Sequence, residues 1–208
     1  ERLDLGYEAL RAINPGIILA SISGYGQAGP YREYMGYGPA IPPLTGLAAG
    51  TGYVNGEPEE LGLSMPDPNA GITAAMAVVS ALLKRDETGE GDHLDVSLWE
   101  ATGVLNVSAW MDYSMNGREA ERIGNRHPDM APHGCFGCAG EDKWVSIACR
   151  SDGEWLALSD LMGSNLGNDA RFATVAGRKK HEDELEAAIS EWASDRDRWE
   201  VARALQAL

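Results

Sequence analysis

The fold is decided by the stretch GIILASIS, residues 16–23, which is apolar almost without interruption. A continuous apolar run of this length, bounded by glycine and proline, is typical of a strand buried on both faces of a parallel sheet. Residues 4–13 are expected to form a short helix that stops at residues 14–16, Asn-Pro-Gly. A helix that leads into a buried strand predicts an α/β fold.

A helix is expected at residues 69–85, directly after the sequence Met-Pro-Asp-Pro at 65–68. Its apolar run, 70–83, falls short of the ~20 residues of a membrane span, so we expect a buried helix. Proline suits the first helical position, because its missing N–H would have no acceptor there. Asp67 is therefore expected at the N-cap, kept ionised by the helix dipole, either as a plain cap or as a nucleophile.

The other elements follow from hydrophobic periodicity and from turn residues. In chain order we expect a strand at 93–98, a helix at 99–115, a strand at 143–149, and helices at 155–162, 182–192 and 196–208. Residues 118–143 are polar and rich in turn residues, which places a domain boundary at their start. The expected domains are therefore 1–117 and 118–208.

Charge and cysteine content limit the class of protein. The formal net charge of −15 argues against binding to nucleic acid or to an anionic membrane surface. Three cysteines are too few for a disulfide framework, so we expect a reducing compartment. The first residues are acidic and helical rather than typical of a signal peptide, which favours a cytoplasmic protein.

Three short motifs could indicate chemistry, and each has a plainer interpretation. The glycine pattern at residues 24–29 lacks a following helix, so we expect a turn that lets the backbone pass close to another segment. Cys135 and Cys138 form a single C-x-x-C in a loop before a strand, and we expect buried thiols and no metal site. His127 and His133 share one loop and could line a cleft, although solvated histidines are the default.

Five blocks of the chain occur in the same order in one known family. They are 14–30, Asp67 with Gly71, 82–98 (LLKRDETGEGDHLDVSL), 125–134 (NRHPDMAPHG) and 152–155 (DGEW). Together they resemble family III CoA-transferases, which include formyl-CoA transferase, carnitine CoA-transferase and α-methylacyl-CoA racemase. The resemblance implies part of a Rossmann-like large domain followed by an incomplete, smaller α+β domain. Family members are about twice as long, and an interlocked homodimer is implied for the full-length protein.

The resemblance also implies a set of site residues. Asp67 corresponds to the family's nucleophile, which would form a mixed anhydride and then an aspartyl–CoA thioester. The segment that would lie against CoA and the aspartate comprises Met35, Gly36, Tyr37 and Gly38. The substrate pocket would include Gly24, Gly26, Gln27 and His133. The implied partners are an acyl-CoA and a carboxylic acid, with CoA as a substrate and no tightly bound cofactor.

Two alternatives stay open beside CoA transfer. An acyl-CoA racemase or isomerase would move an α-proton, but racemases carry a histidine and an acid where this chain has Tyr37 and Gly38. Gly38 also departs from the acidic residue common in the transferases. The second alternative is a non-catalytic fragment that only folds or dimerises. The glycine-rich lid of formyl-CoA transferase is absent, so we expect neither formate nor oxalate as the acid.

Overall fold

The computed structural model describes residues 5–60, 62 and 64–208, and the chain divides into two compact units, 1–122 and 123–208. Each unit is described by itself. The first expected helix begins at Tyr7 (α1, Tyr7–Ile13), and Asp4, where the expected helix starts, lies outside the described residues. The assignment of residues 1–117 and 118–208 to a large and a small domain remains a prediction.

The first unit is built on a parallel pair of strands. β1 (Ile18–Ser23) pairs with β2 (Asp92–Ser97), with Ile18 opposite Asp92 and Ser23 opposite Ser97. A parallel pair needs a long crossover connection, which here contains a helix, and this confirms the α/β character. β1 is nevertheless not buried on both faces as expected: Ile22 is 49% exposed, because the described residues provide only two strands for this sheet.

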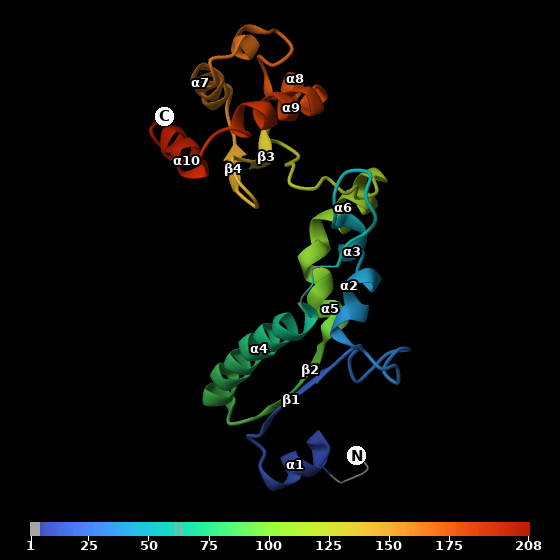
Figure 1. Cartoon of the computed structure of the whole chain (residues 1–208). Helices are drawn as coiled ribbons and strands as arrows, with labels where there is room; N and C mark the ends of the chain where they lie inside the picture. Colours follow the sequence, from blue (N-terminus) through green and yellow to red (C-terminus); the bar gives the residue numbers. More distant parts are fainter. Residues whose placement is uncertain (1–4, 61, 63) are drawn as a thin grey trace. The chain divides into compact units, whose positions relative to one another are not determined.

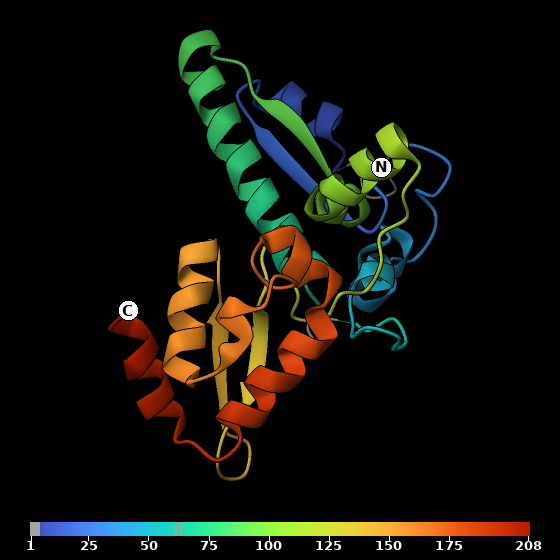
Figure 2. The same cartoon turned by 90° about the horizontal axis from the view of Figure 1, so that it is seen from above.

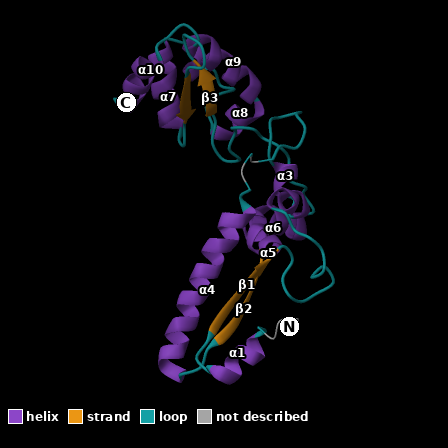
Figure 3. Ribbon diagram, turned by 60° about the horizontal axis from the view of Figure 1, so that its bottom comes forward, coloured by secondary structure: helices purple, strands orange, loops and turns teal. Residues whose placement is uncertain are grey.

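The crossover helix α4 (Pro66–Thr88) runs along the two strands and also contacts α5 (Leu98–Gly103), as Figures 1 and 3 show. The side that packs on them is made of small residues, with Ala70, Ala74 and Ala81 buried. Alanine lets the helix approach the sheet closely, so the larger apolar side chains point outward. Those exposed residues are Ile72, Met76, Val79 and Leu83. The expectation of a buried helix is therefore wrong for most of its surface.

Short helices complete the first unit: η1 (Gly38–Ala40), α2 (Ile41–Leu44) and α3 (Leu47–Gly50). The helix expected at 99–115 is broken into α5, η2 (Val104–Asn106) and α6 (Val107–Asn116). At this break Trp110 folds back over Gly103, where any Cβ would overlap the indole ring. Asn106 and Trp110 both donate to the carbonyl of Thr45, which holds the chain in this bend.

The second unit surrounds an antiparallel hairpin of β3 (His133–Gly137) and β4 (Trp144–Ala148). Its helices are α7 (Asp152–Met162), η3 (Asn165–Asn168), α8 (Val175–Lys180), α9 (Glu182–Ala193) and α10 (Arg198–Gln206). Neither β3 nor α8 was expected. Gly134 and Gly137 interrupt the apolar alternation of β3, so its sequence resembles a loop.

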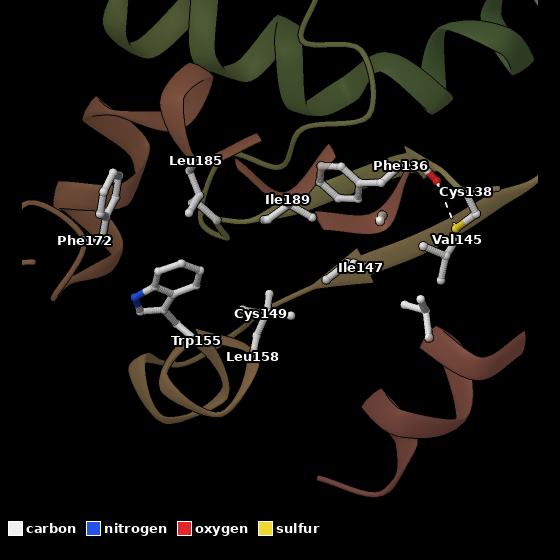
Figure 4. Packing of buried hydrophobic residues seen from close by; sticks show 13 residues of the cluster. Phe136, Cys138, Val145, Ile147, Cys149, Trp155, Leu158, Phe172, Leu185 and Ile189 are labelled. Carbon is white, nitrogen blue, oxygen red and sulfur yellow. Dashed lines mark hydrogen bonds between the residues drawn. The ribbon is translucent and has the colours of Figure 1, made fainter. Parts of the chain in front are cut away.

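Figure 4 shows the core of this unit, in which one face of the hairpin packs against helices. Phe136, Val145 and Ile147 of the hairpin belong to one buried cluster with Trp155 of α7 and Ile189 of α9. Figure 2 shows the two strands between α7 and α9, and α10 packs beside β4. Among the described helices, none combines the length and the apolar character that crossing a membrane would require.

Candidate active site

The glycine loop after β1 brings two backbone segments into direct contact. A Cβ on Gly24 would lie 2.5 Å from the Cα of Gly36, and the reverse holds for a Cβ on Gly36. No helix follows residues 24–29, so the loop lacks the helix N-terminus that receives the phosphates in a dinucleotide-binding loop. The expected close passage of the backbone is therefore confirmed, and its partner is the segment 35–38.

A carboxylate on β2 holds the middle of this loop. The backbone N–H of Gln27 donates to both oxygens of Asp95, at 3.0 and 2.8 Å. Gly26 precedes it with a φ of +83°, a conformation that favours glycine. Sequence reasoning did not assign this anchoring role to Asp95, although its position near the end of the strand paired with β1 could have indicated it.

Aromatic packing fixes the rest of the loop. The ring of Tyr31 lies 5.4 Å from that of Tyr34 and 5.6 Å from that of Trp99, measured between ring centres. Tyr25 lies 5.9 Å from Trp99, whose indole N–H donates to the carbonyl of Leu44. Such aromatic contacts stabilise the arrangement by about 0.5–1.5 kcal/mol per pair beyond the burial of surface.

The last residue of the segment 35–38, Gly38, contacts the carboxylate of Asp67. Met35 and Tyr37 are 80% and 68% exposed, whereas Gly38 is buried. Any Cβ at position 38 would overlap Oδ2 of Asp67. The carboxylate therefore lies directly against the backbone of Gly38, which joins the expected CoA segment to the expected nucleophile.

Asp67 does not cap the helix, and this corrects the sequence-based expectation. Met65 is at the N-cap position and Asp67 is the second residue of α4. The helix starts at Pro66, before the expected residue 69, because Met65 already has helical dihedral angles and its carbonyl accepts from the N–H of Asn69. Both prolines lie in the first turn, where a missing N–H removes no helical hydrogen bond. Asp67 is exposed there, and the helix dipole still favours its negative charge.

His133 lies in the second unit, on β3. It lines a pocket of about 350 Å³ together with Asn125, Cys135 and Ser146, among others. Its Nδ1 atom lies 2.5 Å from the carbonyl oxygen of Asn125, which fixes the ring. The structure thus brings Gly24 into contact with Gly36, and Gly38 into contact with Asp67, within the first unit. His133 lines a pocket of the second unit.

The cysteines differ from the expected pair of buried thiols in a loop. Cys135 lies on β3 and is exposed, because its side chain is on the face of the hairpin away from the core, near the hydroxyl of Ser146. Cys138 and Cys149 are buried, and burial raises the pKa of Cys149 to about 11. Within residues 5–60, 62 and 64–208 no group of three or more potential ligands is placed to hold a metal ion.

Comparison with known proteins identifies relatives over the whole chain. The model of the family described as CoA-transferase family III matches residues 1–208, which confirms the resemblance found in the sequence blocks. The acetyl-CoA:oxalate CoA-transferase of Acetobacter aceti is 38% identical over 91% of this chain and 49% of its own length. The succinyl-CoA–D-citramalate CoA-transferase of Chloroflexus aurantiacus is 35% identical over 92% of this chain and 48% of its own length.

A solved structure supports the same relationship. The crystal structure of a CAIB/BAIF family protein from Brucella suis matches with a TM-score of 0.90 and 34% identity. The match covers 99% of this chain and 54% of that one. The chain therefore has the mixed α/β fold of this family and spans about half the length of the relatives it matches.

Proposed function

The chain belongs to CoA-transferase family III, and we propose that it carries the nucleophile, Asp67, for transfer of coenzyme A from an acyl-CoA to a carboxylic acid. The observation that carries this proposal is the contact between the Asp67 carboxylate and the backbone of Gly38. The carboxylate is exposed, and its backbone belongs to the first turn of a 23-residue helix, whose dipole attracts negative charge. Both properties suit a nucleophile.

The chemistry divides one exchange into steps of similar energy. A carboxylate oxygen of Asp67 attacks the acyl carbon, the C–S bond breaks, and CoA thiolate leaves behind an acyl-aspartyl anhydride. The thiolate then attacks the aspartyl carbonyl carbon, which releases the first acid as its carboxylate and forms an aspartyl–CoA thioester. An incoming carboxylate reverses the two steps, which yields the new acyl-CoA and restores Asp67.

Backbone N–H groups of glycine residues can stabilise the intermediates of such a reaction. Each attack places negative charge on a carbonyl oxygen, and backbone N–H groups are the usual donors to such an oxyanion. Because Gly38 has no side chain, its backbone lies directly against the Asp67 carboxylate, and Gly24 packs in the same way on Gly36. In this proposal the exposed side chains of Met35 and Tyr37 offer a surface to CoA.

The wider assembly is proposed on family membership alone. We propose the interlocked homodimer and the Rossmann-like large domain for the full-length protein, and His133 with Gly24, Gly26 and Gln27 for the substrate pocket. The acid is not specified: the relatives described above are named for oxalate and for D-citramalate. The expectation that oxalate is not the acid is untested.

Trapping with hydroxylamine tests the role of Asp67. The protein is incubated with an acyl-CoA and hydroxylamine, which converts either aspartyl intermediate to an aspartyl hydroxamate that peptide mass spectrometry detects. We expect the hydroxamate at Asp67 and its absence from the Asp67→Asn variant. Asp86→Asn is the matched control, since Asp86 lies on the same helix and is also exposed.

The rival functions give different results when the same incubation is carried out in deuterium oxide. A racemase would incorporate solvent deuterium at the α-carbon of the acyl group and form no hydroxamate. A non-catalytic fragment would do neither. Transfer that persists in Asp67→Asn would exclude Asp67 as the nucleophile.

A further inference from the structure

Three groups meet at the start of α4: the Cα of Gly38, the side chain of Ser64 and the carboxylate of Asp67. A Cβ at position 38 would overlap Oδ2 of Asp67 and would lie 2.8 Å from both Cβ and Oγ of Ser64. Real Cβ atoms essentially never come within 3.0 Å of a neighbouring atom. No residue with a side chain therefore fits at position 38 while both neighbours stay in place.

The surrounding backbone gives Gly38 and Ser64 little freedom to move. The carbonyl of Gly38 accepts from the N–H of Ile41, a fully buried residue. The carbonyl of Ser64 accepts from the N–H of Asp67 at 3.2 Å, and Pro66 between them is fully buried. A side chain added at position 38 would therefore displace the end of the Asp67 side chain, which is the most mobile of the three groups.

We infer that Gly38 and Ser64 are positioning residues for Asp67. The missing side chain at position 38 provides the space in which the carboxylate lies, and Ser64 bounds that space on its other side. This inference rests on the proposed role of Asp67 as nucleophile. Its consequence is kinetic, because a misplacement of a reacting group by about 1 Å can reduce the rate by about a hundredfold.

Gly38→Ala tests the inference, with Gly50→Ala as the matched control. Gly50 ends α3 in the same unit, and a Cβ there would meet only the Cβ of Ala120, at an ordinary 3.9 Å. We expect Gly38→Ala to lower kcat by about 10- to 100-fold while KM for the acyl-CoA changes less than about twofold. Gly50→Ala should keep both values. A raised KM with an unchanged kcat would instead assign Gly38 to CoA binding and overturn the inference.

A second readout does not depend on activity. A water-soluble carbodiimide with an amine modifies exposed carboxylates, and peptide mass spectrometry gives the rate at Asp67. Gly38→Ala should raise this rate by about threefold or more, because the carboxylate is pushed off the backbone into solvent, while the rate at Asp86 stays constant. Equal rates at Asp67 in the variant and the parent would also overturn the inference.

Ser64 provides a variant that keeps the proposal testable if Gly38→Ala fails to fold. Ser64 is exposed, so Ser64→Ala should fold, loosen the space around the carboxylate, and raise the carbodiimide rate at Asp67.

Adding Ser64→Gly to Gly38→Ala should restore part of kcat, since it frees room beside the new methyl group. Unchanged reactivity in Ser64→Ala, or strict additivity in the double variant, would remove Ser64 from the proposal. Transfer that persists in Asp67→Asn would refute the proposed function, whereas the carbodiimide rates test the positioning by itself.

Discussion

The Nδ1 atom of His133 lies 2.5 Å from the carbonyl oxygen of Asn125. A carbonyl oxygen only accepts, so Nδ1 carries the proton of the neutral ring and Nε2 keeps a lone pair. The relation is reversed at His127, where the backbone N–H of Asp129 donates to Nδ1 at 3.0 Å. The two rings, whose centres are 5.4 Å apart, therefore hold opposite tautomers.

Nuclear magnetic resonance can test these tautomers directly. At alkaline pH, long-range ¹H–¹⁵N spectra of the imidazoles should show a proton on Nδ1 of His133 and on Nε2 of His127. Each ring is the control for the other, and His133→Gln and His127→Gln assign the signals. A proton on Nε2 of His133 would show that the contact with Asn125 is not formed in solution.

Arg178 is expected to be the most important charged residue for the stability of the second unit. It is fully buried, donates to the carbonyls of Ala131 and Phe172 at 2.6 and 3.0 Å, and pairs with Asp152. Removing its side chain creates a cavity and leaves two buried carbonyls without a hydrogen-bond donor. We expect Arg178→Ala to lower the free energy of unfolding by about 3 kcal/mol in urea titrations.

Arg150→Ala is the control for that experiment. Arg150 pairs with Glu154 at the surface, where its own side chain is 78% exposed, and exposed pairs contribute little. The expected loss is below about 1 kcal/mol. Equal losses for the two arginine variants would contradict the structural role given to Arg178.

The three cysteines should differ in reactivity. Cys135 is exposed, whereas burial protects Cys138 and Cys149 and raises the pKa of both thiols. With excess maleimide at neutral pH we expect one thiol to react rapidly, at Cys135, and all three to react after unfolding in urea. Fast labelling of Cys149 in the folded protein would contradict the core packing.

Stability should also fall in alkali because of Cys149. Burial raises its pKa from an ordinary 9.0 to about 11, so the folded state holds the thiol proton more tightly than the unfolded state does. The stabilisation is fully present below about pH 9 and is lost as the pH rises through about 11, a change of at most about 3 kcal/mol. Cys149→Ala should show a shallower loss of unfolding free energy across this range. Identical slopes in parent and variant would contradict the prediction.

Local sequence patterns predicted most of the helices and strands. The errors arose where two local signals competed, or where glycines interrupted a pattern. The strand at 93–98 and the helix at 182–192 follow from periodicity alone, and they were found within one residue of the expected ends. The start of α4 was misplaced because two prolines can each begin a helix, and only the backbone angles of Met65 decide between them. β3 was missed because glycines hide its alternation.

The sequence by itself determined the α/β class, the family and the candidate nucleophile, because these depend on local periodicity and on ordered blocks of residues. Only the tertiary structure decided that Gly24 packs on Gly36, and that the carboxylate of Asp67 lies against the backbone of Gly38. The same holds for the side chain of Ser64, which lies beside Gly38. The contacts of Gly24 with Gly36 and of Gly38 with Asp67 join different segments of the chain, so they depend on how loops cross at the end of β1 and the start of α4. Periodicity within one element holds no information about what the next segment will touch.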